Sequence, residues 1–206
     1  MATFHSIQLK SNPGAWHSFV TRNADPDFRK FYDRVLKRDH HTCQYCGFEA
    51  KQFQEVVNLD QNYHNNNLSN LVTACCFCAQ CFFLEFAGKG EYGGGAVIYL
   101  PEIEQTNLNG LCHVLFCAMA NATNYRADAQ GIYNNLRLRA RLVEERYGEN
   151  TSNPAILGQM LIDAQVEGRE EMARTVLKDL KLLPSRTRFS KQIETWAAAA
   201  LNEVSD

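Results

Sequence analysis

Two pairs of cysteines stand at a spacing that is typical of metal ligands. Cys43 and Cys46 form one Cys-x-x-Cys pair, Cys75 and Cys78 form a second, and 28 residues separate the two. Two intervening residues let one tight turn aim both sulfurs at one ion, and Gly47 permits the positive φ that such turns often need. Two such pairs supply the four thiolates of a closed zinc site. We therefore expect these four cysteines to bind a structural Zn²⁺, with iron as the second choice.

The other four of the eight cysteines are less easily assigned. Cys81 forms a further Cys-x-x-Cys pair with Cys78, and Cys76 lies beside the second predicted pair. The sequence leaves open whether Cys76 or Cys81 replaces one of the four predicted ligands. Cys112 and Cys117 lie in an apolar stretch and are expected to be small core residues.

Three histidines and a glycine run are further candidates for chemical sites. His40 and His41 precede the first cysteine pair, and His64 lies in an asparagine-rich loop, so all three are expected on solvated loops. The run Gly93–Gly95 lacks the preceding strand, the following helix and the lysine of a phosphate-binding loop, which favours a flexible turn.

Composition indicates a soluble globular chain that keeps its thiols reduced. The 206 residues are 45% hydrophobic and 21% charged, with a net charge of −2, which argues against a broadly basic nucleic-acid binder. The N-terminal residues show no basic start followed by an apolar run, so we expect no secretory signal. The apolar stretch 108–122 is too short to cross a bilayer. In a reducing compartment, clustered cysteines indicate metal rather than disulfides.

The predicted metal ligands must be positioned by short elements around them. Asp25 and Pro26 carry the signature of a helix start, and the helix is expected to end near Asp39. The segments that follow are predicted as a strand at 53–57, a polar loop at 58–70, a strand at 71–74 and a helix at 76–86.

The rest of the chain is predicted to be mostly helical. Residues 1–24 are expected to be irregular, with one strand around 4–9, and another strand is expected at 96–100. The predicted helices cover 105–122, 126–147, 155–166, 169–182 and 190–203. The expected fold class is therefore α+β and mostly helical, with a zinc-binding N-terminal region over 1–100 and a helical region over 101–206 packed on it.

Basic residues gather in two stretches of the helical region. Their expected environment is solvated helix surface, and a docking patch for an acidic partner is the alternative. They are Arg137, Arg139, Arg141, Arg146, Arg186, Arg188 and Lys191.

Three segments together resemble the zinc module of HNH nucleases, a ββα-metal unit. They are Val35-Leu36-Lys37-Arg38-Asp39 with Thr42-Cys43-Gln44-Tyr45-Cys46-Gly47, then Val56-Val57-Asn58-Leu59-Asp60 with Asn65-Asn66, and Asn70-Leu71-Val72-Thr73-Ala74-Cys75-Cys76-Phe77-Cys78. The resemblance covers about residues 28–87 and implies an HNH-like ββα core with a helical C-terminal extension.

The residues that an HNH nuclease needs for catalysis are missing. The resemblance places Val57 and Asn58 where active members carry a metal ligand and the histidine general base. Valine cannot ligate a metal, and asparagine cannot accept a proton near neutral pH. The candidates for the last metal ligand are also apolar: Ala79, Phe82, Phe83 and Leu84. We expect no catalytic residue and a catalytically inactive HNH relative.

Charge supports the same expectation. No Lys or Arg occurs from Gln52 to Gly88, although a nuclease must place this element against phosphates. The alternative is a metal-dependent endonuclease with a rearranged site that uses His64, Asp60 and Asn58.

The whole chain also resembles the IcmJ (DotN) family of the Dot/Icm type IVB secretion system. The resemblance rests on the degenerate cysteine module, the phrase Val97-Ile98-Tyr99-Leu100-Pro101-Glu102 and the helical tail. It implies a cytoplasmic scaffold or adaptor without membrane insertion, peripheral at the inner membrane. Its implied partners are the C-terminal segment of the coupling ATPase DotL and the IcmS–IcmW adaptor, in a complex that helps substrate recruitment, with no nucleic acid.

Overall fold

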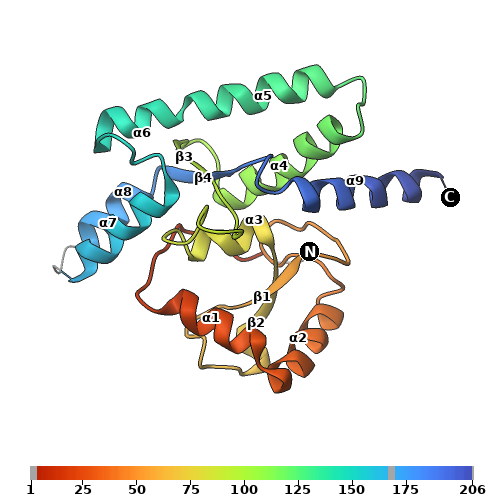
Figure 1. Ribbon diagram of the computed structural model, residues 1–206, viewed down its shortest axis with the longest axis horizontal. Helices are drawn as coiled ribbons and strands as arrows, with labels where there is room; N and C mark the ends of the chain where they lie inside the picture. The colour runs from red at the N-terminus through yellow and green to blue at the C-terminus, as the bar shows by residue number, and fades with distance from the viewer. Residues whose placement is uncertain (1–3, 167–169, 206) are drawn as a thin grey trace.

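The computed structural model describes residues 4–166 and 170–205, and it has a mixed fold in which helices dominate (Figure 1). The expected α+β class is confirmed at this level. The elements in chain order are α1 Ala15–Ala24, α2 Pro26–Arg38, β1 Gln54–Asn58, η1 Leu68–Asn70, β2 Leu71–Cys75, α3 Cys76–Ala79, η2 Gln80–Phe82, β3 Gly95–Tyr99, α4 Gln105–Ala120, α5 Arg126–Leu138, α6 Ala140–Tyr147, α7 Pro154–Val166, α8 Glu170–Leu177, β4 Leu180–Pro184 and α9 Ser190–Ser205.

A helix and a hairpin form the first layer. The Asp25 side chain caps α2 by accepting a hydrogen bond from the amide of Asp27, which confirms the predicted helix start. β1 and β2 pair antiparallel, and both lie within a residue of their predicted bounds. α2 packs on this hairpin, where Val35 contacts a small buried cluster with Val56 and Leu71. The segment from α2 to α3 therefore forms a packed unit that contains the four predicted cysteine ligands.

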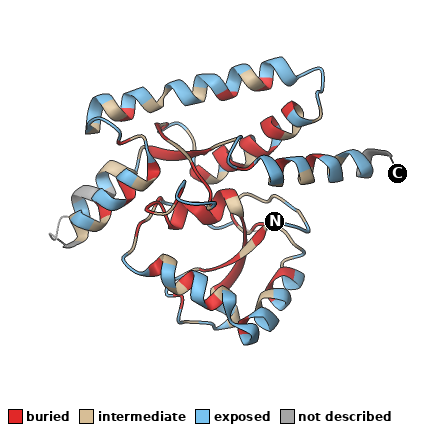
Figure 2. Cartoon of the chain, viewed as in Figure 1, coloured by how far each residue is buried: buried red, intermediate tan, exposed pale blue. Residues whose placement is uncertain are grey.

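A second small sheet organises the C-terminal half. β3 pairs with β4 antiparallel, α4 packs on β4, and α6 packs on β3. Figure 1 shows α3 between this layer and the β1–β2 hairpin. The main buried core is one cluster of apolar side chains whose first member is Ile7 and whose last is Ile193, so it includes residues of both halves of the chain. Figure 2 shows buried residues in both halves.

The outer edges of the second sheet are capped. The amides of Val97 and Tyr99 on β3 donate to the carbonyl oxygens of Ser152 and Arg139. On β4, the Gln105 side chain donates to the carbonyl of Leu182 over 2.9 Å and accepts from its amide over 2.8 Å. These contacts satisfy backbone groups that an open sheet edge would expose.

The N-terminal residues differ from the prediction. Residues 4–9 form no strand, and the expected irregular stretch contains α1. α1 forms because its aromatic side chains pack on the segment after α3: Trp16 stacks on Phe86 at 5.1 Å and Phe19 contacts Phe83 at 4.8 Å between ring centroids.

The helix predicted at 76–86 is shorter than expected. It ends at Ala79 and continues only as the single turn η2. The Lys10 amide donates to the Cys81 carbonyl, and the Leu84 amide donates to the Lys10 carbonyl. The N-terminal segment thus forms hydrogen bonds with backbone groups of Cys81 and Leu84 that would be paired within a longer helix.

Two predicted helices of the C-terminal half were also wrong in part. The helix at 126–147 breaks at Arg139, whose carbonyl accepts the amide of Tyr99 from β3. The helix at 169–182, whose first residue lies outside the described residues, ends at Leu177, and its last residues form most of β4. The short apolar run at 180–184 becomes a strand because β3 lies beside it.

Among the described residues, no helix is both long enough and apolar enough to span a membrane.

Candidate metal centre

Two local structures position the four predicted cysteine ligands. Cys43 and Cys46 lie on a turn that closes with a hydrogen bond from the Gly47 amide to the Cys43 carbonyl, and Gly47 has a φ of 76°. Cys75 ends β2, and Cys78 lies in the first turn of α3, as the strand-to-helix register predicted. The turn faces the strand–helix junction.

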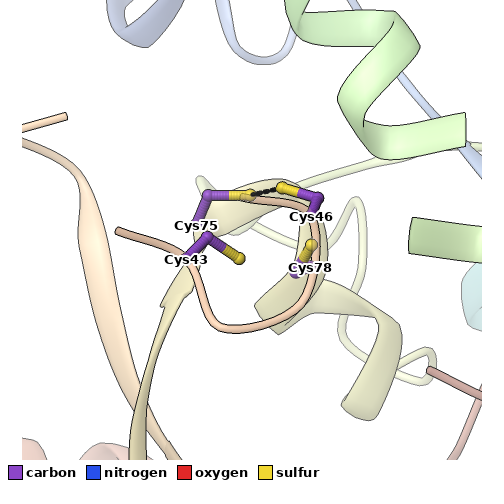
Figure 3. A group of neighbouring side chains, drawn as sticks. All are labelled: Cys43, Cys46, Cys75 and Cys78. Carbon is purple, nitrogen blue, oxygen red and sulfur yellow. Dashed lines mark hydrogen bonds between the residues drawn. The ribbon is translucent and has the colours of Figure 1, made fainter. Parts of the chain in front are cut away.

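The four sulfurs form one cluster (Figure 3). Their Sγ atoms all lie within 4.8 Å of one another, and those of Cys46 and Cys75 are 3.6 Å apart. A tetrahedral zinc–thiolate site places its sulfurs about 3.8 Å apart, because each Zn–S bond is about 2.3 Å. A disulfide would need about 2.05 Å. The residues present therefore fit one tetrahedral metal ion.

Burial makes uncompensated thiolates unfavourable at this site. Three of the sulfurs belong to fully buried residues, and Cys46 is half-buried. Burial raises the pKa of the Cys75 and Cys78 thiols well above the usual range. Burial acts the same way on Cys43, but hydrogen bonds with the other three thiols outweigh it and hold the pKa of Cys43 well below its usual range. Four thiolates in such a place need a metal ion to compensate their charge.

α4 supplies a second set of groups behind the sulfurs. Asn109 Nδ2 donates to Cys78 Sγ over 3.2 Å and to the carbonyl of Phe77 over 3.3 Å. One turn later, His113 Nε2 lies 3.3 Å from Cys75 Sγ. N–H groups of this kind orient metal-bound thiolates and tune their charge.

The His113 ring is held by aromatic neighbours. It stacks between Phe48 at 3.6 Å and Phe77 at 4.3 Å between ring centroids, and Trp196 lies edge-on to it. Burial lowers the pKa of His113 to about 3, so the ring is neutral near pH 7. With its proton on Nε2, the neutral ring donates to Cys75.

The remaining cysteines lie outside the cluster. Cys81 is buried, and its thiol donates to the Phe77 carbonyl at 3.4 Å, as a helical thiol does. Cys76 is half-buried and is absent from the four-sulfur group. Cys112 is fully buried in the core, as expected, whereas Cys117 is only half-buried.

A buried arginine contacts Asn58, one of the two positions for which the resemblance predicts lost catalytic residues. Asn58, at the end of β1, accepts a hydrogen bond from the Arg22 guanidinium, and its amide donates to the carbonyls of Asn62 and Asn65. Arg22 also donates to the Val56 carbonyl over 2.6 Å. Its side chain is buried and lies over the ring of Phe28 at 4.2 Å. Burial lowers the pKa of Arg22 to about 10, so the guanidinium stays charged near pH 7.

The other candidates offer no second metal site among the residues that the structure describes. His40 and His64 are exposed, and His41 is half-buried. Val57 and the four apolar helix candidates, Ala79, Phe82, Phe83 and Leu84, are buried in the core. The one group of metal-ligating side chains found in the described residues is the four-cysteine cluster.

Sequence reasoning missed Asn109, His113 and Arg22. A signal existed for the first two: Gln105, Asn109 and His113 follow at four-residue intervals in a charge-free apolar helix, and all three are buried. Polar residues on one buried helix face need partners, so this stripe indicates a polar contact. Nothing in the sequence indicated that Arg22 would meet Asn58, because α1 was not predicted.

Comparison with known proteins gives the family. No protein-family model matches the chain. The chain is 53% identical over 200 residues to the "Type 4 apparatus protein DotN" of Legionella pneumophila subsp. pneumophila (strain Philadelphia 1), a match that covers 97% of this chain and 93% of the relative. This agreement along nearly the whole length confirms the resemblance found in the sequence, and the chain belongs to the DotN family.

Proposed function

We propose that this protein is a zinc-stabilised, catalytically inactive scaffold of a type IV secretion apparatus. The observation that carries the proposal is the pairing of a four-cysteine cluster with a buried arginine at the HNH-like position. The four-cysteine cluster supplies a structural metal site. The arginine holds Asn58, at one of the two positions where a nuclease would need its catalytic metal ligand and general base.

The ligand set favours zinc. Four cysteines leave no open coordination position for water or substrate, which is the pattern of a structural site. The groups that contact the sulfurs come from α4, so a bound ion would tie the N-terminal half to the helical half. Structural zinc contributes on the order of 10 kcal/mol or more of apparent binding free energy in small domains.

An HNH-like origin is supported by the order of elements. β1, β2 and α3 follow one another as a hairpin and a helix, with one cysteine pair before them and one at the strand–helix junction. Inactivity is supported by Arg22: its guanidinium hydrogen-bonds Asn58 and the Val56 carbonyl at the end of β1. A fixed cation there disfavours a second, catalytic cation by charge repulsion.

Membership of the DotN family supports a role in the secretion apparatus. The relative's name states that it is a type 4 apparatus protein. We extend this to the partners that the resemblance implies: the C-terminal segment of the coupling ATPase DotL, with the IcmS–IcmW adaptor in the same complex. The protein would then act peripherally at the cytoplasmic face of the inner membrane and help substrate recruitment.

A pull-down of the tagged full chain from its own cells, with mass spectrometry, tests the partner. We expect a membrane ATPase and the two adaptor proteins to be enriched. Enrichment of nucleic acid without the ATPase would contradict the scaffold role. Inactivity has its own test: plasmid DNA incubated with purified protein and magnesium or manganese should stay intact, and nicking that disappears in His64→Ala would establish the nuclease alternative.

A further inference from the structure

A hollow of about 920 Å³ lies beside the β3–β4 sheet, and no cysteine of the described residues lines it. Its wall combines the glycine loop before β3, one face of α5, the start of α7 and the segment that follows β4. None of these segments contributes a cysteine of the four-sulfur cluster.

The charged groups that line the hollow are all basic. They come from three distant parts of the chain: Lys89, Arg137, Arg186 and Arg188. Among the described residues that line it, none is Asp or Glu. A cleft lined by one sign of charge raises the local concentration of ligands of the opposite sign. The hollow is therefore suited to a negatively charged ligand.

Two of the arginines are available for a ligand. Within the part of the chain that the structure describes, the guanidinium groups of Arg137 and Arg186 make no hydrogen bond or ion pair. Both lie near Tyr133, a lining residue whose hydroxyl donates to the Pro184 carbonyl. Burial raises the pKa of Tyr133, whereas a hydrogen bond from the Arg186 amide and, to a smaller extent, the charges of Arg137 and Arg186 lower it.

Arg188 ties the segment after β4 to the glycine loop before β3 by hydrogen bonds. Its guanidinium donates to the carbonyl of Gly93 over 3.0 Å and to that of Gly90. Gly94 has a φ of 127°, and a Cβ there would lie 3.1 Å from the Arg188 side chain. The glycine run that was predicted to be a turn thus packs against Arg188. Lys89, which also lines the hollow, belongs to the same loop.

The start of α7 adds a further positive element. Asn153 caps this helix by accepting from the Ala155 amide over 3.0 Å, and Pro154 is its first residue. Asn153, Pro154 and Ala155 all line the hollow, so the positive end of the helix dipole faces the same space as the arginines.

The surroundings favour a polypeptide over a small ligand. Ile156, at the rim, is 40% exposed, and Met160, one turn further along α7, is 45% exposed. These two exposed apolar side chains on α7 lie beside a basic hollow, which suits an extended segment that carries both carboxylates and apolar side chains. Arg137 and Arg188 are exposed, so such a segment can reach them without unfolding any element.

We propose that the hollow formed by Lys89, Arg137, Arg186 and Arg188 binds an acidic, partly apolar peptide segment of a protein partner. The proposal rests on the proposed function only in that the ligand is taken to be part of a protein. A synthetic peptide therefore tests it, and its failure can be told apart from failure of the pull-down.

The test is fluorescence anisotropy of the full chain with a labelled peptide that alternates Glu and Leu. Its Gln–Leu counterpart and a single-stranded oligonucleotide of similar length serve as comparison ligands. We expect binding of the Glu peptide alone, weakened by salt. Arg137→Glu and Arg186→Glu should each weaken it about tenfold or more, as for loss of one charge-assisted hydrogen bond.

Arg141→Glu, on the exposed surface of α6 and outside the hollow, is the matched control and should change the affinity less than about twofold. An equal loss in Arg141→Glu would overturn the proposal, because binding would then follow net charge alone. No binding of the Glu peptide at about 1 mM, or tighter binding of the oligonucleotide, would overturn it as well.

Discussion

Asn109 on α4 donates a hydrogen bond over 3.2 Å to the sulfur of Cys78 on α3. Its side-chain oxygen accepts from Gln105, which also pairs with the backbone of Leu182 on β4. A continuous polar path therefore runs from the second sheet to the cysteine cluster through a buried helix face. The cluster is part of the core that joins the two halves of the protein, so losing its metal should affect more than the cysteine turn.

Substitution of a ligand should remove the metal and unfold the cysteine region. In Cys43→Ser, a hydroxyl replaces a thiolate in a buried tetrahedral set, and we expect loss of bound zinc with insolubility or a much lower Tm. Metal analysis of the purified protein and thermal melting measure this. Cys117→Ser is the control: this half-buried residue lies outside the cluster, so the variant should keep its zinc. A soluble, folded, metal-free Cys43→Ser protein that still bound its partner would contradict the account.

The cysteines next to the ligands can be tested in the same way. Cys81→Ser and Cys76→Ser should each retain one zinc per chain, because neither sulfur belongs to the four-sulfur group. Loss of zinc from either variant, with Cys75→Ser retaining it, would reassign the site to a different cysteine set.

His113 should strengthen zinc binding without being a ligand. His113→Phe keeps a ring that can stack between Phe48 and Phe77 but removes the N–H that faces Cys75. We expect a fold that is kept and a zinc affinity weakened about 10- to 100-fold, measured by competition with a chromophoric chelator. His17→Phe, on the exposed face of α1, should leave the affinity unchanged. Unaltered affinity in His113→Phe would restrict the ring to a packing role.

Arg22 should stabilise the fold through Asn58 and the Val56 carbonyl. Arg22→Met keeps much of the side-chain volume but leaves buried acceptors unpaired, so we expect a loss of about 2–4 kcal/mol in the free energy of unfolding by urea. Arg34→Met, on the exposed face of α2, should change it by less than about 0.5 kcal/mol. Nuclease activity should stay absent in Arg22→Met, since removing the cation restores neither a metal ligand nor a general base.

Two helical glycines should respond in opposite directions to alanine. A Cβ on Gly158 of α7 would lie 2.3 Å from the backbone nitrogen of Glu85, so Gly158→Ala should destabilise the fold by about 1–3 kcal/mol. Gly131 of α5 has open space around the same position, and Gly131→Ala should stabilise by up to about 1 kcal/mol. Urea unfolding of both variants checks the packing of α7 on the segment after α3. Similar effects of both substitutions would contradict that packing.

The sequence predicted the parts of the site that are encoded locally. The spacing of Cys43 and Cys46, and the register that places Cys75 at a strand end and Cys78 in a first helical turn, depend on a few neighbouring residues. The helix start at Asp25 was equally local, since its cap and proline adjoin each other. These predictions needed no knowledge of the tertiary fold.

The rest depends on contacts between distant segments. The chain at 180–184 has no strand signal strong enough to exclude a helix, and only its pairing with β3 makes it β4. Likewise, α3 is cut short by hydrogen bonds to Lys10, and Arg22 reaches Asn58 only because aromatic packing holds α1 in place. The basic hollow is of the same kind, since α5 and the segment after β4 bring its arginines together.

Native mass spectrometry of the purified full chain tests the central claim most directly. We predict a mass that exceeds that of the 206-residue chain by one zinc ion, and loss of this ion together with the folded charge-state distribution after treatment with a strong chelator. A metal-free chain with a compact charge-state distribution, unchanged by the chelator, would contradict a zinc-stabilised scaffold.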